Sequence, residues 1–209
     1  MRKIHGLVLS VCGLLTTVSL AGNSAEASES GREPTPVSAG VADSDQVGTL
    51  AGVQRGCGGL PNGGTISLRS ASNDRYVAAE VEYEGGSNGL LRARSGDNAG
   101  SWEHYRLRHQ GGTVWALQNV NNGRYVTVER EASGENANAL RARAGTVEGS
   151  WQEFELQCYQ GTATWMLYAL TNDRYVSVER EFTGYNANAL RARSASVGGS
   201  WEQFNLYLH

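Results

Sequence analysis

Three tryptophans recur at a nearly constant spacing, each inside a Gly-Ser-Trp string. They are Trp102, Trp151 and Trp201, which lie 49 and 50 residues apart. An indole ring offers an apolar face on which the C–H groups of a pyranose ring can pack, while the sugar hydroxyls need directional polar partners. The recurring tryptophans therefore predict three copies of a sugar-binding surface.

Charged residues that could supply these polar partners recur with the same spacing. A carboxylate can accept hydrogen bonds from two adjacent hydroxyls, and a guanidinium can donate to ring or linkage oxygens. Each candidate glutamate and arginine is followed two residues later by another of its kind, as in Glu129/Glu131 and Arg141/Arg143. With the tyrosine of each Arg-Tyr-Val triplet, the candidate carbohydrate-binding residues are Glu80, Glu129, Glu179, Arg92, Arg141, Arg191, Tyr76, Tyr125 and Tyr175.

The same residues have a second interpretation that needs no ligand. Glutamate and arginine on neighbouring strands can form cross-strand ion pairs worth about 0.2–1 kcal/mol each. The tryptophans could instead cover the bottom of a barrel, if a β-bulge shifts them to the other face. Triplication alone would also copy polar residues without any function.

The loop after each glutamate pair distinguishes the copies. Tyr83 stands there in the first copy and Phe182 and Tyr185 in the third, whereas the second has Ala132 and Glu135. If loop aromatics extend the binding surface, the second copy is predicted to be the weakest site.

Short strands, not helices, are predicted to position these residues. Apolar and polar residues alternate with period two in residues 125–131 and 140–144, and no window of a dozen residues has helical periodicity. Asn138 and Asn188 are predicted to form turns between such strands. Alternate side chains of a strand point to opposite faces. The residues predicted to face the core are Val126, Val128, Leu140, Ala142, Leu68, Leu117 and Leu167.

The alternation also predicts where the tryptophans point. In the string that ends at Leu156, Phe154 and Leu156 share one face, and Trp151 falls on the opposite, polar face. The tryptophans are therefore predicted to lie outside the core.

The repeats predict the fold class. Residues 64–110, 111–160 and 161–209 each offer about four strands, so the domain at 64–209 offers about twelve. A propeller would need more blades, and a solenoid would need atypical end repeats. The sequence predicts an all-β protein with a β-trefoil fold, in which a six-stranded barrel is capped by three hairpins.

The repeated strings are similar to those of a known family. Asn73–Glu80 has the sequence NDRYVAAE, its later copies contain NGRYVTVE and NDRYVSVE, and each is followed by LRAR and a GSWExF-like string. This order resembles the fascin-like β-trefoils over residues 64–209. Eukaryotic members bundle actin, whereas secreted microbial trefoils of this appearance bind carbohydrate. One such microbial family takes β-1,3- and β-1,6-glucans with one site per repeat, which the resemblance implies here.

The N-terminal region has the pattern of an export signal. Arg2 and Lys3 precede an uncharged apolar run that is too short for a membrane anchor, and Ala25-Glu26-Ala27 is typical of a cleavage site. Residues 1–27 are therefore predicted to be a secretory signal peptide, and the protein to be secreted without membrane attachment. Residues 28–63 have no aromatic residue and are predicted to form a flexible leader.

Charge and cysteine content narrow the possible partners. Without residues 1–27 the chain has 16 basic and 20 acidic residues, a net charge of −4, which does not favour nucleic acid as a partner. The two cysteines left after cleavage, Cys57 and Cys158, are predicted to form a disulfide in an exported protein.

No catalytic or metal-binding motif stands out. The histidines do not recur across the repeats, and the cysteines are too far apart for a metal cluster. Paired carboxylates such as Glu129 and Glu131 raise glycoside hydrolysis, but three copies without a cleft-forming insertion disfavour it. The prediction is a monomeric, non-catalytic polysaccharide- or glycan-binding protein with no cofactor and no metal. The alternative is a secreted trefoil that binds a protein, such as a protease inhibitor. It would act through nonrepeated segments, which are the connections at 108–113 and 157–163 and the leader at 28–63.

Overall fold

A computed structural model describes residues 36–38, 40 and 52–209 of the chain. The predicted signal peptide at 1–27 lies outside the described residues. The described helices are single 3₁₀ turns, and none is long and apolar enough to cross a membrane. The strands are β1 (Pro36–Ser38), β2 (Val53–Gln54), β3 (Thr65–Ser70), β4 (Tyr76–Glu80), β5 (Leu90–Ser95), β6 (Tyr105–Gly111), β7 (Val114–Asn119), β8 (Tyr125–Val128), β9 (Leu140–Ala144), β10 (Phe154–Tyr159), β11 (Thr164–Ala169), β12 (Arg174–Val178), β13 (Leu190–Ser194) and β14 (Phe204–Leu208). The 3₁₀ turns are η2 (Gly85–Ser87), η3 (Gly134–Asn136), η4 (Ser150–Gln152), η5 (Gly184–Asn186) and η6 (Ser200–Glu202).

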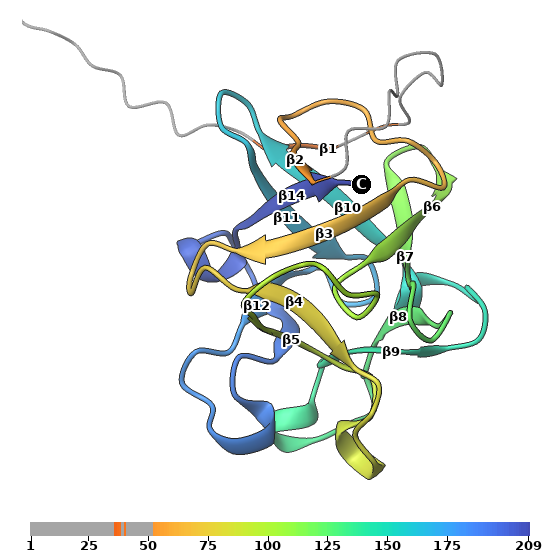
Figure 1. Ribbon diagram of the computed structural model, residues 1–209, viewed down its shortest axis with the longest axis vertical. Coiled ribbons are helices and arrows are strands. Elements are labelled where there is room, and N and C mark those ends of the chain that lie inside the picture. Colours follow the sequence, from red (N-terminus) through yellow and green to blue (C-terminus); the bar gives the residue numbers. More distant parts are fainter. Residues whose placement is uncertain (1–35, 39, 41–51) are drawn as a thin grey trace, which may run out of the picture. The chain divides into compact units, whose positions relative to one another are not determined.

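The first and last strands of the three repeats close into a six-stranded barrel (Figure 1). Strands β3, β6, β7, β10, β11 and β14 pair antiparallel in that order, and β14 returns to pair with β3. The two middle strands of each repeat form the hairpins β4–β5, β8–β9 and β12–β13. The predicted all-β trefoil with twelve strands in its three repeats is therefore confirmed.

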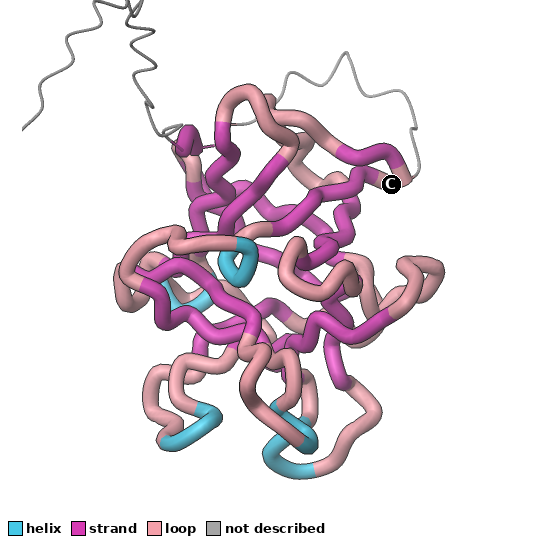
Figure 2. Tube along the Cα trace, turned by 90° about the vertical axis from the view of Figure 1, so that its left-hand side faces the viewer, coloured by secondary structure: helices cyan, strands magenta, loops and turns pink. Residues whose placement is uncertain are grey.

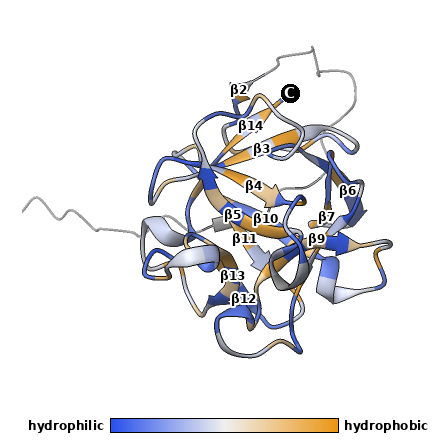
Figure 3. Cartoon of the chain, turned by 60° about the horizontal axis from the view of Figure 1, so that its bottom comes forward, coloured by the Kyte–Doolittle hydropathy of each residue, from blue (hydrophilic) through white to orange (hydrophobic). Residues whose placement is uncertain are grey.

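The strand alternation places the core as predicted. Val126, Val128 and Leu140 are fully buried, and the barrel interior also holds the large side chains of Trp115 and Trp165. Figure 3 shows the hydrophobic colour concentrated on the strands and the hydrophilic colour on many of the connecting loops. Burial of a valine or leucine side chain stabilises the fold by about 1.5–3 kcal/mol. Packing in the core is therefore enough to explain why the apolar positions repeat.

Each hairpin contains a β-bulge whose extra residue is the second arginine of the Leu-Arg-Ala-Arg string. In repeat two, Tyr125 pairs with Ala144 and Val126 pairs with Ala142, so Arg143 has no partner on the opposite strand. The side chain of Asn122 donates to the Ala142 carbonyl at 2.8 Å, and Asn73 and Asn172 make the same bond in the other repeats. The repeated asparagine thus stabilises the bulge, because buried carbonyls need a donor.

The three repeats meet at a pseudo-threefold axis, at the end of the domain where η2, η3 and η5 lie together in Figure 1. A small cluster of Leu90, Ala139 and Ala189 is buried there, one residue from each repeat. The preceding residues, Gly89, Asn138 and Asn188, all have positive φ, at 73°, 59° and 59°, as expected for turn formers. Figure 2 shows loops gathered at this end of the domain.

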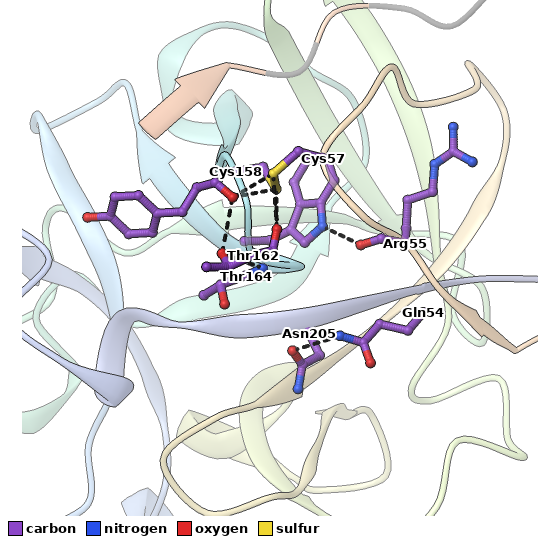
Figure 4. The surroundings of a disulfide bond; sticks show 9 residues. Gln54, Arg55, Cys57, Cys158, Thr162, Thr164 and Asn205 are labelled. Carbon is purple, nitrogen blue, oxygen red and sulfur yellow. Dashed lines mark hydrogen bonds between the residues drawn. A yellow bond between two sulfur atoms is a disulfide. The ribbon is translucent and has the colours of Figure 1, made fainter. Parts of the chain in front are cut away.

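Residues before the first repeat pack against the barrel. Strand β2 pairs with β14, β1 pairs with β10, and Leu60 is fully buried. The predicted disulfide between Cys57 and Cys158 is present, with a Cα–Cα distance of 5.4 Å (Figure 4). The leader predicted for residues 28–63 is therefore partly ordered, because backbone pairing and the disulfide hold its described part. A bridge closing a loop of this length contributes roughly 4–5 kcal/mol in the chain-entropy model.

Candidate functional site

The recurring tryptophans lie at the surface on tight turns. Trp102 and Trp151 are each 40% exposed, and Trp201 is half-buried. Trp151 and Trp201 are the middle residues of η4 and η6, and strand geometry resumes only at Phe154 and Phe204. Strand alternation predicts the orientation of Trp151, but this residue lies in a 3₁₀ turn, where alternation does not apply. Trp151 and Trp201 are directed outward by their 3₁₀ turns, and Trp102 lies on a turn at the matching position.

A buried polar residue follows each tryptophan and fixes its loop. Glu103, Gln152 and Glu202 are 4%, 8% and 7% exposed. Gln152 Oε1 accepts a hydrogen bond from the Glu148 amide at 3.1 Å, and Glu202 Oε2 accepts one from Gly198 at 3.3 Å. Sequence reasoning missed these anchors. The signal was available, because the position after each tryptophan is polar in all three repeats.

The candidate glutamates are buried, and each pairs most closely with the second arginine of its string. In repeats one and three, Nη1 of the first arginine, Arg92 or Arg191, also lies 3.7 Å from the carboxylate. Glu80, Glu129 and Glu179 are 3%, 8% and 2% exposed. Arg94 Nη2 donates to Glu80 Oε2 at 2.8 Å while its Nε contacts the other oxygen, and Arg143 holds Glu129 in the same way. In repeat three, Arg193 Nε contacts Glu179 Oε1. The bulge is what turns this arginine toward the glutamate at the end of the neighbouring strand. Such bidentate contacts fix the carboxylate and guanidinium planes at the surface of the hairpin.

Burial dominates the electrostatics of two of these carboxylates. Burial raises the pKa of Glu129 and of Glu179 above the usual range, although the neighbouring arginines oppose the shift. Glu129 Oε1 and Glu179 Oε1 are buried and lie in ion-pair contact with the arginine Nε, so each carboxylate is held by its arginine.

The first arginine of each string joins neighbouring repeats. Arg92 Nε donates to the Ala187 carbonyl at 2.8 Å, and Arg191 Nε donates to Ala137 at 2.7 Å. Arg141 Nη1 completes the cycle with the Asn88 carbonyl at 3.1 Å. Each of the three bonds runs from one repeat to another around the pseudo-threefold axis. These arginines therefore have a structural role that cross-strand spacing alone did not suggest.

Each candidate tyrosine lies far along the chain direction from the candidate glutamate of the same repeat. Tyr76 is four positions before Glu80, which corresponds to about 13 Å in an extended strand. Tyr76 packs against Tyr207 with ring centroids 5.6 Å apart, and Tyr175 packs against Tyr168 at 5.0 Å. Tyr125 is half-buried at the start of β8, in the matching position. The tyrosines therefore form part of the barrel surface, not of the Glu–Arg site.

Surface hollows differ between the repeats. In repeat one, a hollow of about 150 Å³ is lined by Trp102, Glu80 and Arg94 together, with Glu82 and Glu103 beside them. In repeats two and three, Trp151 and Trp201 line hollows formed by their own loops, residues 148–152 and 198–202. Of the predicted residues, Trp102 and Glu80 thus line one hollow in repeat one, and the arginine there is Arg94 in place of the predicted Arg92. Among the described residues, no group of His, Cys, Asp and Glu could hold a metal ion.

Comparison with known proteins defines the class. No family model matches the chain, and no curated protein does. The designed threefold-symmetric protein ThreeFoil superposes with a TM-score of 0.56 at 20% identity, over 68% of this chain and 97% of that one. The Rhizoctonia solani agglutinin gives 0.55 at 14% identity, over 72% of this chain and 97% of its own. The exo-β-1,3-galactanase 1,3Gal43A from Clostridium thermocellum gives 0.58 at 15%, over 72% of this chain and 31% of that chain. The chain is a β-trefoil, and the narrower resemblance to fascin-like trefoils stays a prediction.

Proposed function

We propose that this chain is an exported, non-catalytic carbohydrate-binding protein that takes a polysaccharide, such as a β-glucan, at up to three equivalent sites. The observation that carries the proposal is the exposed tryptophan on a fixed turn, with a buried Glu–Arg pair on the hairpin, once in every repeat. Two proteins of like fold, by their names an agglutinin and a galactanase, support carbohydrate as the ligand class.

Each part of the site has a distinct task in this proposal. The indole face packs against the C–H side of a sugar ring. The carboxylate accepts from sugar hydroxyls, and the second arginine holds the carboxylate in position and offers its remaining N–H groups. The site therefore uses Arg94, Arg143 and Arg193, whereas the first arginines of the strings, Arg92, Arg141 and Arg191, serve the fold.

The glutamates are poorly suited to hydrolysis. A glycosidase needs an acid and a second carboxylate about 5–10 Å apart on either side of the bond to be cut. Glu80 is held in a bidentate ion pair with Arg94, and its neighbour Glu82 is exposed at the rim of a small hollow. A carboxylate fixed in this way favours binding over proton transfer.

Three shallow sites on one rigid barrel favour a polymeric ligand. Each site orders flexible sugar for a modest contact area, so its own affinity is expected to be weak. A polysaccharide can engage several sites at once and gains from their high effective concentration, whereas a monosaccharide cannot. Retention on insoluble polymer should therefore greatly exceed the affinity for the corresponding sugar.

The test is a pull-down of the purified protein on insoluble polysaccharides, including β-1,3-glucan, β-1,6-glucan, chitin and galactan. A variant with Trp102, Trp151 and Trp201 changed to Ala should stay folded and lose retention, while a Trp→Phe triple variant, which keeps an aromatic face, should retain part of it. Failure of the unmodified protein to bind any polymer would overturn the proposal and favour a protein partner.

A further inference from the structure

Each pair of neighbouring repeats meets at a junction beside the pseudo-threefold axis. The side chains at two loop positions determine how far each junction is filled. Between repeats one and three, Tyr83 and Tyr185 form an edge-to-face pair with centroids 5.9 Å apart. Between repeats three and two, the Phe182 ring lies 5.4 Å from the Arg191 guanidinium, and Asn186 donates to Glu135 at 2.8 Å. Large side chains thus occupy both of these junctions.

The third junction, between repeats two and one, has small residues at both positions. Ala132 corresponds to Tyr83 and Phe182, and Gly86 corresponds to Glu135 and Tyr185. A hollow of about 380 Å³ is found there, lined by Ala132 and η3 residue Asn136 on one side and by Gly85 and Asn88 on the other. This volume is within the usual range of about 300–1,000 Å³ for small-ligand sites.

The base of this hollow is a built polar site. Glu129, Arg141 and Arg143 line it, and Glu129 and Arg141 are only 8% and 6% exposed. Arg141 is held in place by the Asn88 carbonyl and by Asn136 Oδ1, at 3.1 and 2.9 Å. The Glu129 carboxylate is held by Arg143, whose Nη2 donates to Oε2 at 2.5 Å and whose Nε is in ion-pair contact with Oε1.

We infer that this hollow, here called the Ala132 hollow, is a separate binding site for a single neutral hexopyranose unit, such as a side branch or chain end. The hollow places donor groups of Arg143 and Asn136 beside the Glu129 carboxylate, which suits a neutral ligand whose hydroxyls both donate and accept. The hollow is distinct from the one beside Trp151, because the two share no lining residue. The inference rests on the proposed carbohydrate-binding function. It gives repeat two an additional binding site, whereas the loop sequence predicted that repeat two would be the weakest site.

The structure also explains why loop aromatics do not extend the tryptophan surface. Phe182 lies over Arg191, the arginine that bonds to the neighbouring repeat, and Trp201 lines a hollow that does not include Phe182. The aromatic ring of Phe182 therefore fills the junction between repeats three and two. The alanine at the equivalent position, Ala132, leaves the junction between repeats two and one open.

The experiment is an NMR titration of the ¹⁵N-labelled purified protein with methyl β-D-glucopyranoside and methyl β-D-galactopyranoside, with glucuronic acid as the charged contrast. At least one neutral glycoside should produce saturable shifts at residues 85–88, at Ala132 and at the Asn136 side-chain amide. Ala132→Phe should weaken this binding at least tenfold, and it is expected to fold because phenylalanine fills the same place in repeat three. Phe182→Ala, which needs no added volume, should create matching shifts at residues 134–137.

The outcomes separate this inference from the three-site proposal. In the triple Trp→Ala variant, polymer retention should fall while the shifts at the Ala132 hollow persist. Shifts at the hollow that are unchanged by Ala132→Phe, their absence with both glycosides, or tighter binding of glucuronic acid would overturn the inference. None of these results would by itself remove the tryptophan sites.

Discussion

The two arginines of each Leu-Arg-Ala-Arg string have the same spacing in every repeat and opposite surroundings. In repeat two, Arg141 is 6% exposed and donates to the carbonyl of Asn88 in another repeat. Arg143 has a side chain that is 58% exposed and pairs with Glu129 at the surface of its own hairpin. Triplication copied both residues equally, so recurrence does not separate a structural role from a binding role. Burial and the identity of the partner do.

The largest effect is expected from the first arginine. Arg141→Met removes hydrogen bonds to Asn88 and Asn136 that join two repeats. We expect the free energy of unfolding to fall by about 3 kcal/mol, since each hydrogen bond from a charged group contributes roughly 1.5–3 kcal/mol. Denaturant unfolding measures this change.

The matched control for that variant removes both members of the Glu129–Arg143 pair, Glu129→Gln with Arg143→Met. Arg141 keeps its hydrogen bonds to Asn88 and Asn136, so the loss should be smaller, near ~1 kcal/mol. If the control is as destabilising as Arg141→Met, the distinction between the two arginines is wrong.

A smaller effect, on binding, is expected from the second arginines. Changing Arg94, Arg143 and Arg193 to Gln should weaken polysaccharide retention about tenfold, or about 1.4 kcal/mol, because the glutamates lose the groups that orient them. The control changes the exposed Arg75, Arg124 and Arg174 to Gln, with the same loss of charge and no contact to the site. Equal weakening in both triple variants would indicate a general charge effect.

The smallest effect concerns pH. Burial raises the pKa of Glu179 above its usual value near 4.5, so its proton stabilises the fold. That contribution is complete below the usual pKa and is lost as the pH rises through the higher folded-state pKa. Glu179→Gln cannot ionise, so its stability relative to the unmodified protein should increase as the pH rises from 4 to 7. A relative decrease in thermal unfolding scans would mean that the attraction to Arg193 outweighs burial.

Much of the fold could be predicted from the sequence because strand alternation and a fifty-residue period depend on local pattern. The core positions, the disulfide and the turn roles of Asn138 and Asn188 followed from such patterns and are confirmed. The exposed position of Trp151 was predicted through an incorrect strand, because alternation does not reveal where a strand gives way to a 3₁₀ turn.

The site depended on features that no local pattern contains. The extra residue of each β-bulge is the arginine in closest contact with the glutamate, and strand register cannot be read from residue types. The bond from Arg141 to Asn88 spans 53 residues, and it forms only because three repeats close around one axis. The Ala132 hollow could have been suspected, since the two small loop residues belong to adjacent repeats, but only the closed fold brings them together.

The central claim is that the recurring tryptophans contact a polysaccharide while the barrel stays rigid, and NMR of the five indole N–H groups tests it most directly. Trp115 and Trp165 are fully buried, and Trp165 Nε1 donates to the Arg55 carbonyl, so these two signals serve as internal controls. On titration with a soluble oligosaccharide of the polymer retained in the pull-down, the signals of Trp102, Trp151 and Trp201 should shift and the two buried signals should not. Shifts confined to the buried indoles, or to residues remote from all three tryptophans, would contradict the account.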